Sequence, residues 1–279
     1  MRSPLFRHCA APITGAALVA GTILIGAQAA SAANDPVTTV TNYKAACQAN
    51  SIIDVTKIQD TSVSVTAPTQ VEAGETFTYR IQPGPSSYPN RDSGATTRNV
   101  SRLKLDFMIP ENSTFVEAAV VGSGTNLDNV PPSVIRVDET GNPSDTGQIL
   151  RLSGDNEVIG NGPSESVSTR SEGGIRAPKL QLNLDGTPNE NGDSWFQLPA
   201  VDVTVVAGEA GTPIEPKLRT DGDAGNFNAY ENFNTFLPKA SFFGIQWANT
   251  RCVPRDSSSD PLNAGAGPLA TVDVVAPPE

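Results

Sequence analysis

The sequence predicts an all-β protein, an antiparallel β-sandwich that is either one elaborated unit or two packed smaller sandwiches. Apolar residues recur at every second position in short segments, which is the period of a strand with one buried face. Glycine- and proline-rich turns separate these segments. No window longer than about ten residues shows the period and the capping residues that a helix needs.

The clearest segment covers residues 99–121. Its apolar residues, from Leu103 to Ile109, alternate with polar ones, so we expect one strand face to be buried and the other to face water. Pro110 ends this strand because it cannot donate a backbone hydrogen bond. A polar turn follows, and a second strand is expected to begin at Phe115.

Further strands are expected wherever the same alternation recurs. In chain order these are residues 63–65, 77–81, 134–137, 149–152, 180–184, 195–198, 201–205, 214–218, 243–247 and 272–274. Between them, residues 154–174 are almost all small or polar and predict a long loop.

Residues 1–32 predict a secretory signal peptide. Arg2 and Arg7 provide a positive start, residues 16–26 form a short apolar run, and the triplet at 30–32 is a small-residue cleavage site. A transmembrane helix is the alternative, but glycines interrupt the run and no charged residue stops it. We therefore expect an exported chain without a transmembrane segment.

The exported chain is expected to have three parts. Residues 33–60 form an extended N-terminal arm, residues 61–255 form the sandwich, and residues 256–279 form a linker and a final strand. Cys47 and Cys252 remain after the leader is removed, and in an oxidising compartment they are expected to form a disulfide that ties the arm to the last strands. Two free thiols are the alternative.

The residue content excludes several function classes. The net charge of -11 becomes -13 when residues 1–32, with their two arginines and no acidic residue, are removed, and nucleic-acid binding needs clustered Lys and Arg instead. The single histidine is His8, within the predicted leader. The exported chain thus has no histidine for Ser-His-Asp or Cys-His catalysis, or for histidine-ligated metals.

An acidic, glycine-rich segment is a candidate calcium site. Asp221, Asp223, Asn226 and Glu231 could supply oxygen ligands in an irregular loop. The EF-hand pattern fails, because its twelfth position is Asn232 rather than a bidentate carboxylate. A simple Asp-Gly turn is the alternative.

Aromatic residues gather in the segment 227–247. Rings interspersed with asparagines suit contacts with a glycan or a lipid, although rings that pin a loop onto the sandwich are the alternative. The candidate ligand contacts are Phe227, Tyr230, Phe233, Phe236 and Trp247.

Two stretches, VSVTAPTQVEAGETFTYRI (63–81) and LKLDFMIPENSTFVEA (103–118), are similar to the immunoglobulin-like repeat of bacterial surface proteins. The resemblance implies an immunoglobulin-like sandwich with an adhesive or spacer role at the cell surface. The leader and the acidic composition are also similar to exported actinobacterial proteins. The residues that carry the resemblance are Val71, Gly74, Phe77, Tyr79, Leu105, Pro110, Thr114, Phe115 and Val116.

We expect a secreted or cell wall-associated, non-enzymatic protein with a structural, adhesive or surface-binding role, whose partner is a protein, glycan or lipid of the cell envelope. One alternative is a lipid or glycan carrier that uses the segment 227–247, for which a deep apolar cavity lined by Phe233, Phe236 and Trp247 would be the sign. The other is a carboxylate-dependent hydrolase, which needs two acids facing each other across a groove. Oligomeric state stays open.

Overall fold

The computed structural model describes residues 35–154, 160–163 and 172–278. The predicted signal peptide and parts of the predicted loop 154–174 lie outside the described residues. The chain from Asn34 onward forms one compact unit. No helix among the described residues has the length and apolar character needed to cross a membrane.

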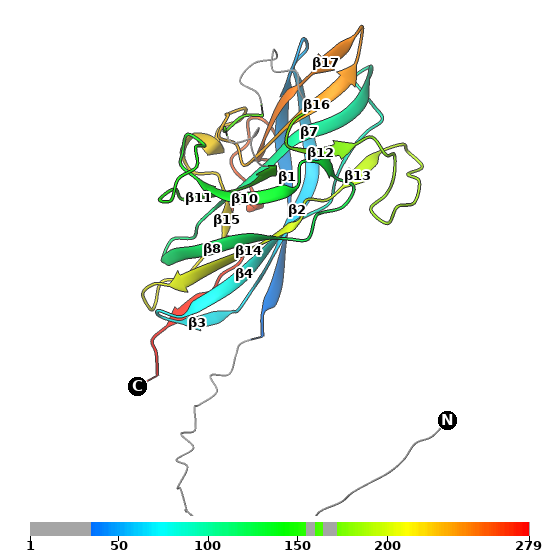
Figure 1. Ribbon diagram of the computed structural model, residues 1–279. Helices are drawn as coiled ribbons and strands as arrows, with labels where there is room; N and C mark the ends of the chain where they lie inside the picture. The colour runs from blue at the N-terminus through cyan, green and yellow to red at the C-terminus, as the bar shows by residue number, and fades with distance from the viewer. Residues whose placement is uncertain (1–34, 155–159, 164–171, 279) are drawn as a thin grey trace, which may run out of the picture. The chain divides into compact units, whose positions relative to one another are not determined.

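The described residues form an all-β structure, as predicted, with two short 3-10 helices, η1 (Gly222–Gly225) and η2 (Ala264–Ala266). The strands are shown in Figure 1. In chain order they are β1 (Val37–Asn50), β2 (Val55–Ala67), β3 (Gln70–Glu72), β4 (Thr76–Pro83), β5 (Ser86–Tyr88), β6 (Arg91–Asp92), β7 (Ala95–Met108), β8 (Ser113–Val121), β9 (Asp128–Asn129), β10 (Pro132–Val137), β11 (Ile149–Gly154), β12 (Ile175–Pro178), β13 (Ser194–Phe196), β14 (Ala200–Ala207), β15 (Lys217–Leu218), β16 (Asn234–Ser241), β17 (Ile245–Trp247), β18 (Asn249–Pro254) and β19 (Asp273–Val275).

The main sheet is a nearly closed, barrel-like antiparallel sheet, rather than the predicted two-sheet sandwich. Its strands follow the order β10-β11-β7-β16-β18-β1-β2-β4-β14-β8, and the edge strands β8 and β10 contact each other. Alternating patterns predict strands but not their partners. The strand order therefore corrects the sandwich prediction, while the all-β class is confirmed.

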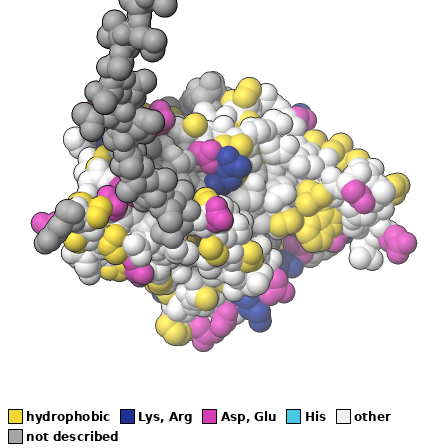
Figure 2. All heavy atoms as spheres, turned by 90° about the horizontal axis from the view of Figure 1, so that it is seen from below, with side chains coloured by type: hydrophobic (Ala, Val, Ile, Leu, Met, Phe, Trp, Pro, Cys, Tyr) yellow, Lys and Arg dark blue, Asp and Glu magenta, His cyan; other side chains and the backbone are white. Residues whose placement is uncertain are grey.

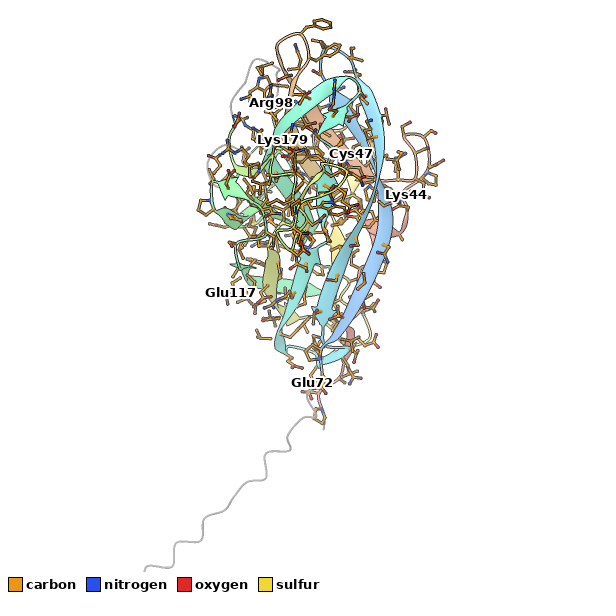
Figure 3. All side chains as sticks on the ribbon, turned by 90° about the vertical axis from the view of Figure 1, so that its right-hand side faces the viewer. Lys44, Cys47, Glu72, Arg98, Glu117 and Lys179 are labelled. Atoms are coloured by element: carbon orange, nitrogen blue, oxygen red, sulfur yellow. A yellow bond between two sulfur atoms is a disulfide. The ribbon has the colours of Figure 1, made fainter. Side chains whose placement is uncertain are left out.

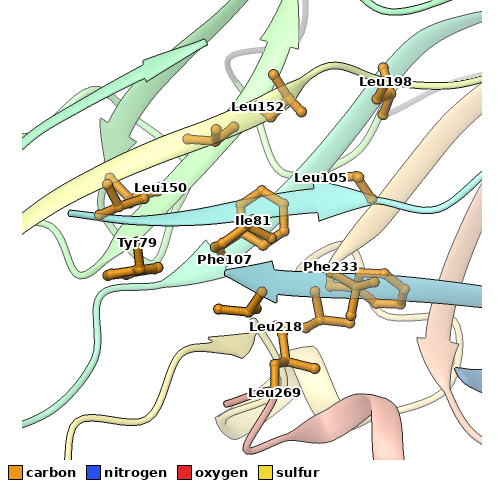
Figure 4. Close-up of a cluster of buried hydrophobic side chains, with 14 of the residues drawn as sticks. Tyr79, Ile81, Leu105, Phe107, Leu150, Leu152, Leu198, Leu218, Phe233 and Leu269 are labelled. Atoms are coloured by element: carbon orange, nitrogen blue, oxygen red, sulfur yellow. The ribbon is translucent and has the colours of Figure 1, made fainter. Parts of the chain in front are cut away.

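The core lies inside this curled sheet. Tyr79 and Ile81 of β4, Phe107 of β7 and Leu152 of β11 are all buried and belong to one apolar cluster (Figure 4). These are the residues that the alternating pattern placed on the apolar face of each strand. The pattern therefore predicted the interior correctly even though it did not predict the sheet order.

The segment 99–121 forms β7, a corner at Pro110 and β8, as predicted. The expectation that the polar face of β7 is wet is wrong, because Arg102, Lys104 and Asp106 are buried. The chain around residues 139–141, 160–163 and 219–232 covers this outer face of the sheet, as the contacts below show. Burial of alternating charged residues needs partners from distant segments, which a local pattern does not reveal.

Two other strand predictions need correction. Residues 180–184 form no extended strand, because the chain folds back through side-chain turns in which Asp185 accepts hydrogen bonds from Thr187. Phe243 lies in the turn between β16 and β17 rather than in a strand. Leu180 and Phe243 are both exposed, so an apolar residue in an alternating pattern was not sufficient for burial.

The predicted disulfide is present and joins two neighbouring strands. Cys47 of β1 lies directly opposite Cys252 of β18, and their sulfur atoms are bonded. Residues 37–50, expected as an arm, form a full strand that pairs with β2 along its length. Disulfides persist in oxidising compartments, so this bond indicates an extracytoplasmic protein.

Candidate functional site

An internal cavity of about 150 Å³ lies inside the curled sheet. On β1, Tyr43, Ala45, Cys47 and Ala49 fall at alternate positions and all line it. Three of these four side chains are small, so this part of β1 leaves space where a larger residue would fill the interior. The opposite wall is aromatic and aliphatic, with contributions from Phe107, Phe196, Leu198, Leu218 and Phe233.

The cavity reaches the surface beside β2. Strand β2 pairs with β4 over Val63–Thr66. Residues between 83 and 89, at the end of β4 and just after it, line the cavity together with the part of β2 that precedes Val63. Lys57 and Gln59 contribute polar side chains from that part of β2. The mouth is thus polar, whereas the interior is mainly apolar.

A second, outer groove of about 180 Å³ adjoins this cavity. Its lining is mostly apolar and includes Ile52 and Ile53 from the turn after β1, Phe242 from the turn after β16, and Trp247 from β17. The same five residues line both spaces, so only their side chains separate the groove from the cavity. They are Ala49, Lys57, Asp92, Thr97 and Pro238.

An ion pair stands at this junction. The Nζ of Lys57 lies 2.7 Å from Oδ1 of Asp92, and both side chains are partly exposed. Solvent screens such a pair, so it contributes little to the free energy of folding. Either side chain can therefore take another partner at low cost. A polar head group at the junction would therefore find both a cation and a carboxylate.

The predicted aromatic residues do not form one mouth. Phe233 and Phe236 line the cavity, and Trp247 lines the groove. Tyr230 lies on the surface, where the guanidinium of Arg251 sits 3.8 Å from its ring centre. Phe227 lines neither space, so three of the five predicted contacts are in the combined site.

The candidate calcium residues lie around η1. Asp221 is held by Lys217, whose Nζ is 3.0 Å away, and Asp223 accepts a hydrogen bond from Asn226. Among the residues that the structure describes, no three Asp, Glu, Cys or His side chains lie close enough to hold a metal ion. Asp221, Asp223 and Glu231 therefore do not converge on one point.

A buried charge cluster lies on the outer face of β7, away from the cavity. Arg151 of β11 binds both carboxylate oxygens of Asp106 through Nε and Nη2, at 2.8 and 2.7 Å. Lys104 lies 3.0 Å and Arg219 3.3 Å from the same carboxylate. Asn161 accepts hydrogen bonds from both arginines. The cluster ties β7, β11 and the loops over them together.

Burial changes the protonation of this cluster. Desolvation would raise the pKa of Asp106, but Arg151 and Lys104 outweigh it and hold that pKa well below its usual value. Desolvation lowers the pKa of Lys104 to about 7, against the opposing effect of Asp106. Nζ of Lys104 also donates to the carbonyl oxygens of Asn161 and Asn232, which matches three donors with three acceptors. The arrangement is that of a structural network.

The inner wall of the site does not follow from the local sequence pattern alone. Its signal is the alternation of small residues at Ala45, Cys47 and Ala49, within the segment expected to be an arm. Small side chains at successive inward positions of a strand indicate a space, once the strand is known to line an interior. Lys57 and Asp92 carried no local signal, because they meet only through the fold.

Comparisons with known proteins provide a distant structural similarity. No family model and no curated protein matches this chain. A crystal structure described as "Putative membrane anchored protein from Corynebacterium diphtheriae" is similar, with 13% sequence identity and a TM-score of 0.40. The similarity covers 86% of this chain and 38% of that chain, so this chain spans well under half of that protein's length. The immunoglobulin-like resemblance has no counterpart among the family models.

Proposed function

We propose that this protein is an extracytoplasmic binding protein, secreted or associated with the cell envelope, that holds the alkyl chain of an amphiphilic molecule. The observation that carries the proposal is the adjacency of the outer groove and the inner cavity, which share part of their lining. An apolar interior with a few polar groups at its entrance is the usual form of a site for such ligands.

The chemistry of the two spaces favours a lipid chain over a glycan. The interior is built from aliphatic and aromatic side chains such as Leu105, Phe107 and Phe233. An apolar cavity of this size accepts a hydrocarbon group without the cost of leaving sugar hydroxyls unpaired. The polar head would remain near Lys57 and Asp92, where both charges are partly exposed.

The other functions expected from the sequence receive less support. A structural or adhesive role makes no use of the cavity. A carboxylate-dependent hydrolase needs two facing acids, and the residues lining the two spaces include one, Asp92, which is paired with Lys57. Both stay predictions from the sequence.

Isothermal titration calorimetry with palmitate tests the proposal. Ala49 lines both spaces, so the larger side chain of Ala49→Phe is expected to take up space in them and weaken palmitate binding by about tenfold or more. Ala49→Ser changes the side-chain volume little and serves as the matched control. Wild type and Ala49→Ser should bind with a negative heat-capacity change, because apolar surface becomes buried.

Two results would contradict the proposal. One is the absence of palmitate binding by the wild-type protein. The other is equal binding by Ala49→Phe and Ala49→Ser, once thermal unfolding has shown that both variants are folded. Binding of a soluble oligosaccharide in place of palmitate would favour the glycan alternative.

A further inference from the structure

Three hairpin turns meet at one end of the main sheet. They are residues 50–55 between β1 and β2, 92–95 between β6 and β7, and 241–245 between β16 and β17 (Figure 1). All three contribute to the outer groove. The ring of Phe242 also lies 3.6 Å from the point where a Cβ on Gly94 would stand. We call these three turns together the hairpin end.

The hairpin end exposes large apolar side chains. Phe243 is 97% exposed at the tip of its turn, Ile52 and Ile53 are 67% and 62% exposed, and Ile245 is 47% exposed. Phe243 also has a φ of 47°, in the left-handed region that costs energy for a bulky residue. Such a residue contributes little to folding, and clustered exposed apolar groups mark a contact surface.

Basic side chains flank the hairpin end. Arg98 donates from Nε to the hydroxyl of Ser241, 2.7 Å away, at the base of the turn that carries Phe243. Lys179 lies near Arg98, and burial together with this like charge lowers its pKa. In the part of the chain that the structure describes, neither residue lies within ion-pair distance of a carboxylate.

Acidic side chains lie toward the opposite end of the sheet. Figure 3 shows Arg98 and Lys179 toward the hairpin end and Glu72 and Glu117 toward the other. Figure 2 shows the molecule from below, where acidic and basic side chains both lie on the face and hydrophobic ones lie among them. The hairpin end itself carries two acids, the exposed Asp54 and Asp92, which is paired with Lys57, and the basic pair Arg98 and Lys179 lies beside its apolar tips.

We propose that the hairpin end docks on a lipid surface with anionic headgroups, inserting Phe243, Ile52 and Ile53 among the acyl chains. Protruding apolar tips suit a deformable lipid phase, and flanking basic side chains suit anionic headgroups. The outer groove opens between the same turns, so a docked molecule would have this entrance at the lipid surface. This docking goes beyond the proposed ligand binding and needs no occupied cavity.

Vesicle flotation with the purified protein tests the docking. We expect partition into phosphatidylcholine vesicles that contain phosphatidylglycerol, and weaker partition into phosphatidylcholine alone. Phe243→Ser should lower the partition coefficient about tenfold or more, because a phenylalanine loses its burial in the acyl chains. Arg98→Gln should reduce the preference for phosphatidylglycerol.

Val40→Ser is the matched control. Val40 is 58% exposed and lies on β1, ten residues before the first turn and about 30 Å from the hairpin end. The Val40→Ser variant should therefore partition into vesicles like the wild-type protein. Equal partition into both vesicle types, or equal partition of Phe243→Ser and Val40→Ser, would overturn the proposal. If the protein does not bind vesicles but forms a dimer that Phe243→Ser disrupts, the apolar side chains of the hairpin end instead contact a second copy of this chain.

Vesicle docking and palmitate binding can be tested independently of each other. Phe243 lines neither the groove nor the cavity, so Phe243→Ser should bind palmitate like the wild-type protein. Loss of vesicle binding with retained palmitate binding supports docking by the tips. Absence of palmitate binding in a protein that still partitions into vesicles would overturn the cavity function alone.

Discussion

At the scale of single residues, Asp106 lies at the centre of a buried charge cluster. One buried carboxylate faces three buried cations, Lys104, Arg151 and Arg219. Asn161 and backbone carbonyl groups accept further hydrogen bonds from these cations. Among the described residues, Asp106 is the fully buried acid of this cluster, and its loss leaves like charges together in a region of low dielectric.

Asp106→Asn tests this account. The amide cannot balance the three cations, and removal of one partner from a buried ion pair typically costs about 3–5 kcal/mol. Urea unfolding should show a loss of this size. Asp202→Asn, which breaks the exposed Arg80–Asp202 pair, is the control and should cost less than about 1 kcal/mol. Equal losses in the two variants would show that Asp106 has no special role.

The same cluster predicts how stability depends on pH. Because the pKa of Lys104 is lowered to about 7 in the folded protein, the unfolded chain binds more protons between about pH 7 and 10. Stability should therefore rise with pH over this window, by up to about 1.4 kcal/mol per unit for one proton. Urea midpoints at pH 7 and 9 measure the rise.

Lys104→Met is the control for that experiment, and it should flatten the rise. Asp106 affects stability at low pH. Its lowered pKa gives stability that is present above about pH 4 and is lost as the pH falls below that value. A wild-type midpoint that is unchanged or lower at pH 9 would contradict the lowered pKa of Lys104.

At the scale of strands, the sequence predicted what depends on local periodicity. The alternation of Leu103 to Phe107 located β7, and Pro110 located its end, because both follow from the backbone geometry of a strand. The buried polar face of β7 could not be predicted, since its partners come from β11 and from Arg219, far along the chain.

The candidate site also combines features that a local pattern predicts with features that depend on strand pairing. Phe233, Phe236 and Trp247 were proposed as contacts because aromatic residues are recognisable in a sequence, and they line the two spaces. The space itself depends on which strands pair, and the pairing order of β1 with β2 and β18 is not encoded in any local pattern.

At the scale of the whole described unit, the curled sheet separates two kinds of environment. Its inside holds the apolar core and the cavity, whereas the outer face of β7 holds the charge cluster. The charge cluster fixes the loops over β7, and the cavity opens on the opposite face of the same strand. This separation allows a space near β1 without loss of the contacts that hold the sheet together.

The central claim is that an alkyl chain enters the cavity behind β1. Intermolecular nuclear Overhauser effects between the methylene protons of bound palmitate and the protein measure this directly. The account predicts contacts to the methyl group of Ala49 and to the ring of Phe233, which both line the cavity. Contacts confined to exposed residues such as Phe243, or no contacts at all, would contradict it.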